Sequence, residues 1–205
     1  MTGSMASIAS ALDGDVARIA SAVRRGMVRV ICRGKGVGAG TVWHPEGLVL
    51  TNAHVAADRN LKVEDAKGER YSATLIAADR KLDLAALSVK ASGLDPIKLG
   101  STTAMRPGEL VFAMGFPLGV DGGFTAGVFI GLETWTPGRG GMGRKWIMAS
   151  LHLRPGHSGG PMVNSKGHLI GINTIMRGPD VGAAIPIEVV KRFLRKSMTS
   201  FQIAA

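Results

Sequence analysis

The chain has 205 residues, a single cysteine (Cys32) and a formal net charge of +10. One cysteine cannot form an intrachain disulfide, which excludes the small extracellular folds that depend on disulfide staples. No segment reaches the roughly 18 consecutive apolar residues of a membrane-spanning helix, and acidic and basic residues interrupt any signal-peptide pattern. As written, the chain is expected to be soluble and cytoplasmic.

The first residues of the chain leave its location open. Residues 1–4 resemble an expression remnant ahead of Met5, so a native leader or anchor and a periplasmic or extracytoplasmic location stay open. The excess of 25 Lys and Arg over 15 Asp and Glu would attract acidic polypeptides, nucleic acid or anionic membranes, although a solvated surface is the simpler explanation. Basic residues are not interleaved with aromatic ones, so we expect no nucleic-acid partner.

The first predicted element is a helix over residues 7–25, where apolar residues recur on one helical face. Short apolar runs separated by glycine-rich turns follow, and this pattern favours an all-β body. The expected strands cover residues 27–33, 37–43, 47–51, 61–64, 71–77, 84–90, 110–115, 122–131, 145–150, 161–164, 169–176 and 181–185. An amphipathic helix over residues 187–198 ends the pattern, with apolar residues inward and basic residues outward.

One segment, Arg154-Pro-Gly-His-Ser-Gly-Gly-Pro161, carries the strongest chemical signal. A serine in the pattern Gly-X-Ser-Gly-Gly-Pro stands beside backbone amides that can stabilise a developing oxyanion, and the glycines permit positive φ angles and close approach. His54 and Asp83 lie upstream, giving the order His, Asp, Ser. Together the three residues predict nucleophilic catalysis by Ser158, with His54 as general base and Asp83 as its orienting carboxylate. Asp79 is the alternative acid, but Asp83 directly precedes the apolar strand.

These motifs resemble the trypsin-like serine proteases, and within them the HtrA/Deg branch. The resemblance extends over roughly residues 26–197 and includes further landmarks. They are Gly40-Thr41-Val42, Gly47 to Asn52, Gly115-Phe116-Pro117-Leu118-Gly119, Gly171-Ile172-Asn173-Thr174 and Ala183-Ala184-Ile185-Pro186.

The resemblance implies a fold of two antiparallel six-stranded β-barrels with short N- and C-terminal helices. The implied organisation is a remnant and helix (1–25), a first barrel lobe with His54 and Asp83 (26–105), a second with Ser158 (106–186), and a C-terminal helix and tail (187–205). The active site would lie in the crevice between the lobes. The oxyanion would be received by the segment Gly156, His157 and Ser158, through the amides of Gly156 and Ser158.

The resemblance also implies an ATP-independent serine endopeptidase that acts on unfolded or damaged polypeptide, in protein quality control. Two alternatives stay open: a protease-fold binding or regulatory module with an inactive or switchable oxyanion hole, and a narrow processing protease that cuts one partner. Departures from the common pattern motivate the first alternative, since His157 stands where the family often has Asn and His152 where a small or apolar residue is usual. No PDZ domain follows within the sequence.

By the same resemblance, the specificity pocket is walled by residues 150–154 and 171–175. The expected substrate-binding residues are Ser150, His152, Asn173, Thr174 and Ile175. Because no aspartate stands at the pocket floor, we expect a preference for small or medium apolar side chains. His152 would narrow this preference or make the pocket more polar. His152 packing elsewhere is the alternative.

Regulation and assembly complete the expectations. The glycine-rich loop 136–145 is predicted to be mobile, and the resemblance implies a regulatory role for its residues Arg139, Gly140 and Gly141. The helix over residues 7–25 would either support a homo-oligomer, a trimer in many HtrA-like domains, or simply cap a barrel. The five histidines lack metal-binding spacing, so we expect no metal site and no cofactor.

Overall fold

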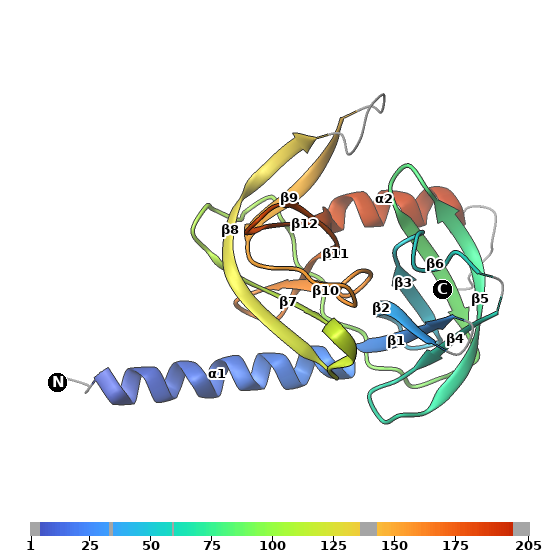
Figure 1. Ribbon diagram of the computed structural model, residues 1–205, viewed down its shortest axis with the longest axis horizontal. Helices are drawn as coiled ribbons and strands as arrows, with labels where there is room; N and C mark the ends of the chain where they lie inside the picture. The colour runs from blue at the N-terminus through green and yellow to red at the C-terminus, as the bar shows by residue number, and fades with distance from the viewer. Residues whose placement is uncertain (1–4, 33–34, 59, 136–142, 199–205) are drawn as a thin grey trace.

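The fold is two closed barrels, each of six antiparallel strands, as the resemblance implied. The computed structural model describes residues 5–32, 35–58, 60–135 and 143–198. The barrels stand side by side, with helix α1 (Met5–Arg25) along one side and helix α2 (Ile187–Met198) across the other (Figure 1). The predicted all-β class with two terminal helices is therefore confirmed.

The first barrel joins its strands in the order β1, β2, β3, β6, β5, β4, and pairing of β4 with β1 closes it. Its interior is filled by aliphatic side chains such as Val30, Val49 and Leu87, which are fully buried. The strands are β1 (Met27–Cys32), β2 (Lys35–His44), β3 (Leu48–Thr51), β4 (Leu61–Glu64), β5 (Arg70–Asp79) and β6 (Leu84–Val89).

The second barrel runs in the order β10, β11, β12, β9, β8, β7. Its strand β8 continues four residues beyond the expected end at residue 131, because it pairs with β9 as far as Trp135 and Arg144. The elements are β7 (Leu110–Gly115), the 3-10 turn η1 (Pro117–Gly119), β8 (Gly123–Trp135), β9 (Arg144–Ser150), β10 (Pro161–Asn164), β11 (Leu169–Gly178) and β12 (Val181–Pro186).

The two helices differ in how they are held. Helix α2 buries Val190 and Phe193 against β6, β11 and β12, so it packs on strands of both barrels. Helix α1 packs through its last turns, where Val23 is buried, whereas Leu12 in its first half is about half exposed. Figure 1 shows this first half running outward past the second barrel.

Short hydrogen bonds join the barrels near the centre of the molecule. The Ala39 amide of β2 donates to the Ser158 carbonyl at 2.8 Å, and the Thr41 hydroxyl donates to the Gly159 carbonyl at 3.1 Å. A shared apolar cluster, which includes Leu50 of β3 and Ile172 of β11, fills the space behind them. The segment after residue 157 is thus fixed against the first barrel.

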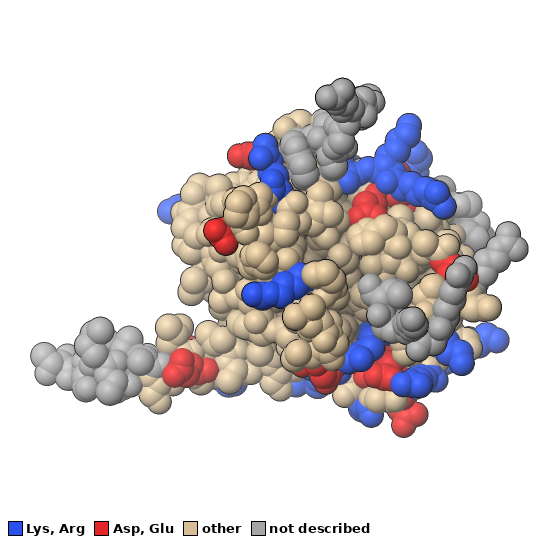
Figure 2. Space-filling model, in the orientation of Figure 1, with Lys and Arg blue, Asp and Glu red and all other residues tan. Residues whose placement is uncertain are grey.

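Charged residues are unevenly distributed on the face shown in Figure 2. Basic and acidic side chains intermingle on the right, over the first barrel, while much of the second barrel is uncharged. Within the described residues, no helix is long and apolar enough to span a membrane.

Candidate active site

Two turns of the first barrel bring an imidazole and a carboxylate together. His54 lies in the turn after β3, and Asp83 ends the turn between β5 and β6 with a φ of 57°. Aspartate tolerates this left-handed conformation better than most residues. The alternative acid, Asp79, instead accepts the Leu82 amide at 2.9 Å and so holds that turn.

The pairing of His54 with Asp83 fixes the orientation of the imidazole ring. His54 Nδ1 lies 2.9 Å from one carboxylate oxygen of Asp83 and 3.0 Å from the other. The His54 backbone amide donates to the same carboxylate at 3.1 Å. Because Nδ1 faces the carboxylate, Nε2 is left to exchange a proton with another group. The His54 side chain is 51% exposed and that of Asp83 18%, so the ring faces solvent and the acid is enclosed.

Two further residues hold Asp83, and the sequence reasoning had not assigned them this task. The Thr174 hydroxyl donates to Asp83 Oδ2 at 2.8 Å, across the gap between the barrels. Asn52 donates its side-chain amide to the Asp83 carbonyl at 2.9 Å. A register shift between Asn173 and Ile175 takes Thr174 out of the ladder with β12, which allows its side chain to point toward the first barrel.

The hydrogen bonds determine the charge state of Asp83. Burial would raise its pKa, but the hydrogen bonds from the His54 side chain and the Thr174 hydroxyl, with the charge and amide of His54, outweigh burial and lower the pKa. Asp83 is consequently ionised at neutral pH and can stabilise a positive charge on His54.

Ser158 lies in the turn that precedes β10. Its hydroxyl donates to the Thr174 carbonyl at 3.0 Å. Thr174 therefore contacts both Asp83, through its hydroxyl, and Ser158, through its carbonyl. Among the described residues the Ser158 hydroxyl makes this bond and none to His54.

The turn before Ser158 is the segment that was expected to receive an oxyanion. Its residues 154–157 are closed by a bond of 3.0 Å from the His157 amide to the Arg154 carbonyl, and Gly156 has a φ of 103°. Pro155 and Gly156 occupy the two central positions, the residues preferred where the second has positive φ. Among the described residues, neither the Gly156 amide nor the Ser158 amide donates a hydrogen bond.

Residues 38–172 of the chain match the family of the trypsin-like peptidase domain. The chain belongs to this family. It is 37% identical over 169 residues to serine protease HTRA1 of Xenopus tropicalis, covering 78% of this chain and 36% of that protein. Mitochondrial serine protease HTRA2 of Drosophila pseudoobscura pseudoobscura is 36% identical over 165 residues, covering 78% of this chain and 39% of that protein. The chain thus spans less than half the length of these relatives.

Solved structures show the same fold. The HtrA-type protease AlgW with a decapeptide superimposes with a TM-score of 0.81 at 24% identity, over 89% of this chain and 67% of AlgW. An AlgW variant with a tripeptide gives a TM-score of 0.80 at 26% identity, over 90% and 64% of the two chains. This trypsin-like peptidase domain is therefore of the HtrA type.

His157 of the HtrA-type domain is a buried histidine whose ring is hydrogen-bonded within the turn 154–157. The side chain is 1% exposed, and its Nδ1 accepts the Arg154 amide at 3.0 Å. Its Nε2 is buried without a partner among the described residues. Burial lowers the pKa of His157, as do the charges of Arg154 and His152, while a hydrogen bond to the Arg154 backbone opposes them. The ring is therefore neutral at pH 7 and can accept the Arg154 amide.

The residues expected to bind substrate do not share one environment. Ser150 is exposed on β9, and His152 is half exposed, with its Nδ1 3.9 Å from Asp180 Oδ1. Asn173 is fully buried and donates to the carbonyls of Met114 and Pro161, so its side chain supports the barrel. Ile175 is half buried next to Thr174.

The loop residues Arg139, Gly140 and Gly141 lie outside the described residues. At the base of that loop, Arg144 stacks on the Trp146 ring at 4.1 Å from its centroid. Burial lowers the Arg144 pKa, while the charges of Asp83 and Asp79 oppose that effect. Arg144 is therefore close enough to Asp83 and Asp79 to feel their charges, which the sequence had not indicated. Within the described residues, no group of three acidic, histidine or cysteine side chains could hold a metal.

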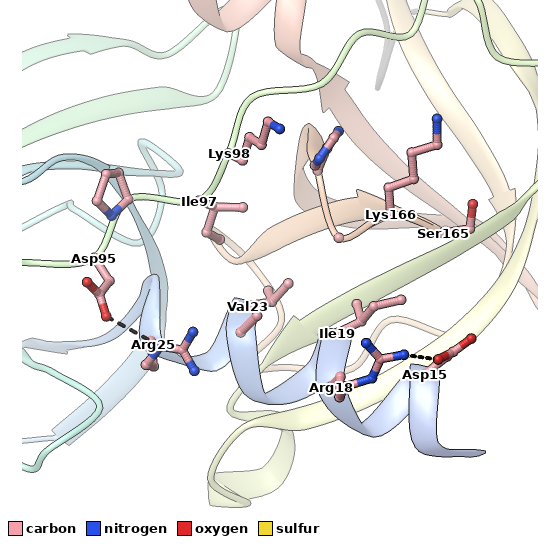
Figure 3. A pocket seen from close by; sticks show the side chains of 14 residues that line it. Asp15, Arg18, Ile19, Val23, Arg25, Asp95, Ile97, Lys98, Ser165 and Lys166 are labelled. Atoms are coloured by element: carbon pink, nitrogen blue, oxygen red, sulfur yellow. Dashed lines mark hydrogen bonds and ion pairs between the residues drawn. The ribbon is translucent and has the colours of Figure 1, made fainter. Parts of the chain in front are cut away.

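A cavity of about 640 Å³ lies away from these residues, between α1, the linker before β7 and the β10–β11 turn. Its apolar wall includes Ile19, Val23 and Ile97 (Figure 3). Two of its cations are already paired within the wall, Arg18 with Asp15 and Arg25 with Asp95. It shares no residue with the site around Ser158.

Proposed function

We propose that the chain is an ATP-independent serine endopeptidase that hydrolyses peptide bonds in unfolded or partner polypeptides. The observation that carries the proposal is the chain of contacts from Asp83 to His54 and, through Thr174, to Ser158, next to two unengaged amides. The names of the HTRA1 and HTRA2 relatives and of AlgW agree with serine protease activity and with polypeptide as substrate.

The reaction follows from the roles these groups can take. Ser158 Oγ attacks the scissile carbonyl carbon while His54 Nε2 takes its proton, and Asp83 stabilises the resulting imidazolium. The carbonyl oxygen becomes an oxyanion and accepts hydrogen bonds from the amides of Gly156 and Ser158. In other proteases, removal of one such donor reduces transition-state stabilisation by about 3 kcal/mol. His54 then protonates the leaving amine as the C–N bond breaks, and an ester remains on Ser158. Water, deprotonated by His54, hydrolyses this acyl-enzyme and restores the serine.

The resting position of Ser158 requires one movement before attack. Its hydroxyl donates to Thr174, so it must rotate about its side-chain bond to donate to His54. Such rotations are fast compared with turnover, and catalytic hydrogen bonds often tighten only when substrate is bound. The present contact is therefore compatible with activity.

A preference for particular substrates is a second proposal, which starts from the half-exposed side chains of His152 and Ile175. We propose that the pocket favours small or medium apolar side chains, because Ile175 offers an apolar surface and His152 offers a polar edge rather than a carboxylate floor. Sequencing the products of a peptide library tests this: cleavage mainly after Arg or Lys would contradict it.

One experiment distinguishes the proposed endopeptidase from the alternative, a binding or regulatory module. Wild-type protein and Ser158→Ala are treated with a fluorophosphonate and weighed by intact-mass spectrometry, with casein cleavage measured in parallel. We expect a single adduct on the wild type, none on the variant, and cleavage only by the wild type. Labelling without cleavage would indicate a narrow processing protease, and folded wild-type protein without any label would favour the regulatory module.

A further inference from the structure

The turn of residues 154–157, which we call the oxyanion turn, is held by a neighbouring loop. We call this loop the clamp loop; it comprises residues 116–122 between β7 and β8. The Phe116 amide donates to the Gly156 carbonyl at 2.9 Å, and the Leu118 amide donates to the Pro155 carbonyl at 3.2 Å. Both carbonyls of the turn therefore point at the clamp loop. With the carbonyls fixed there, the Gly156 amide is directed away from the loop, because the two groups of a peptide unit point in opposite directions.

The clamp loop itself does not adopt a relaxed conformation. Leu118 has a φ of 52°, which is unfavourable for a leucine, and its side chain is 78% exposed. Such a conformation persists only where surrounding contacts impose it. Besides its two hydrogen bonds to the turn, the loop is contacted by two arginines from outside the second barrel.

Arg24, in the last turn of α1, and Arg29, on β1, both contact the buried ring of Phe116. Their guanidinium carbons lie 5.3 and 4.7 Å from the ring centroid. Arg24 also donates to Asp121 of the clamp loop at 2.8 Å, and Arg29 lies 3.9 Å from the same carboxylate oxygen. The loop is thus attached at both ends to a helix and a strand that belong to neither its own barrel nor its own hairpin.

The attachment by Arg24 is close and largely enclosed. The Arg24 side chain is only 19% exposed, and its stem lies so near Gly122 that a Cβ at that glycine would come within 2.9 Å of Arg24 Cδ. One guanidinium nitrogen of Arg24 is buried without a hydrogen-bond partner among the described residues. A buried cation over an aromatic ring is stabilised by the negative ring face, which explains how this nitrogen is tolerated.

We propose that Arg24 is a positioning residue for the oxyanion hole: it fixes the clamp loop through Phe116 and Asp121, and the clamp loop fixes the carbonyls of Pro155 and Gly156. Helix α1 is then part of the catalytic apparatus and does more than cap a barrel. This inference rests on the proposed function, because it concerns the oxyanion hole of that same reaction.

The test compares rates of fluorophosphonate labelling of Ser158, a reaction that requires the hole but no particular peptide substrate. Arg24→Met keeps the apolar stem and removes the charge and the donors. We expect its labelling rate to fall about tenfold or more, approaching the roughly hundredfold effect of losing one oxyanion donor. Asp121→Asn, at an exposed carboxylate, should give a smaller loss in the same direction. Arg24→Lys, which keeps the charge, should restore part of the rate.

The matched control is Arg18→Met on the same helix, since Arg18 is exposed and pairs with Asp15 rather than with the clamp loop. It should label at the wild-type rate. Thermal unfolding of each variant shows that the labelled protein is folded, and Asp121→Asn keeps the test valid should Arg24→Met unfold.

The outcomes separate this inference from the proposed function. If the wild type is labelled and Arg24→Met and Asp121→Asn are labelled at the same rate, the role of Arg24 is overturned. The proposed serine hydrolase activity would then still stand. Equal losses for Arg18→Met and Arg24→Met would also overturn it. Folded wild-type protein that takes no label would overturn both the proposed function and the role of Arg24. The clamp loop would then not be holding an oxyanion hole that supports the reaction of Ser158.

Discussion

At the scale of single residues, Thr174 connects the two halves of the site. Its hydroxyl donates to Asp83 and its carbonyl accepts from Ser158. The hydroxyl contributes one of the hydrogen bonds that keep the Asp83 pKa below its usual range against the opposing effect of burial. A side chain from the second barrel therefore helps to set the charge and orientation of the acid in the first.

Thr174→Val keeps the shape of the side chain and removes that hydrogen bond. A hydrogen bond to a charged group contributes about 1.5 to 3 kcal/mol, so we expect kcat/KM for a cleaved peptide to fall about 10-fold to 100-fold. Fluorophosphonate labelling should slow in parallel. Thr103→Val is the control, because Thr103 bonds to Ser101 on an exposed surface. Full activity of Thr174→Val would show that Asp83 is oriented without the Thr174 hydroxyl.

At the scale of elements, the first turn of α2 is fixed by one carboxylate. Glu188 accepts hydrogen bonds from the Thr102 hydroxyl at 2.6 Å, the Thr102 amide at 2.9 Å and the Ser101 hydroxyl at 2.9 Å. Burial would raise the Glu188 pKa, but these bonds, led by that of the Thr102 hydroxyl, and an amide of the helix lower it. The linker between the barrels is thereby tied to the helix that packs on both.

Glu188→Gln should destabilise the fold by about 1 to 3 kcal/mol, the cost of leaving buried donors poorly paired. The lowered pKa of Glu188 means that its stabilisation is complete above the ordinary pKa of a glutamate and is lost as the pH falls through the lowered folded-state pKa. The free energy of unfolding, measured with denaturant at pH 7 and pH 3, should therefore change more between the two pH values for the wild type than for Glu188→Gln. Glu133→Gln, at an exposed position on β8, is the control. An unchanged difference between the two pH values would contradict the role of Glu188.

The elements also show what the sequence can and cannot predict. Short apolar runs separated by glycine-rich turns predict the strands, because strands of a barrel bury apolar side chains in its core. The site motifs place His54, Asp83 and the turn at 154–157 near one another through the family resemblance. The register shift that frees Thr174, the contact of Arg24 with Phe116 and the resting bond of Ser158 depend on tertiary packing between distant segments. No local pattern encodes such contacts, so sequence reasoning could not predict them.

At the scale of the molecule, the two barrels must meet closely for the site to exist. Gly159 lies at this meeting point with a φ of 83°, and a Cβ there would overlap the Ala39 carbonyl oxygen and the Thr51 hydroxyl. Both of those groups belong to the first barrel. The segment that carries Ser158 therefore needs a glycine for its backbone conformation and for its contact with the other barrel.

Gly159→Ala should separate these two requirements when it is compared with Gly68→Ala. Gly68 has a φ of 84°, but nothing lies within 4 Å of a Cβ placed there. An alanine in this conformation costs about 1 to 2 kcal/mol, so Gly68→Ala should lose that much stability and keep full activity. Gly159→Ala should lose about 1 to 3 kcal/mol more from overpacking. It should also lose fluorophosphonate labelling, because Ser158 and its amide would move with the displaced backbone. Denaturant unfolding measures the stability of the two variants, and fluorophosphonate labelling measures the reactivity of Ser158. Equal stability losses, with Ser158 still reactive in Gly159→Ala, would show that the barrels tolerate separation.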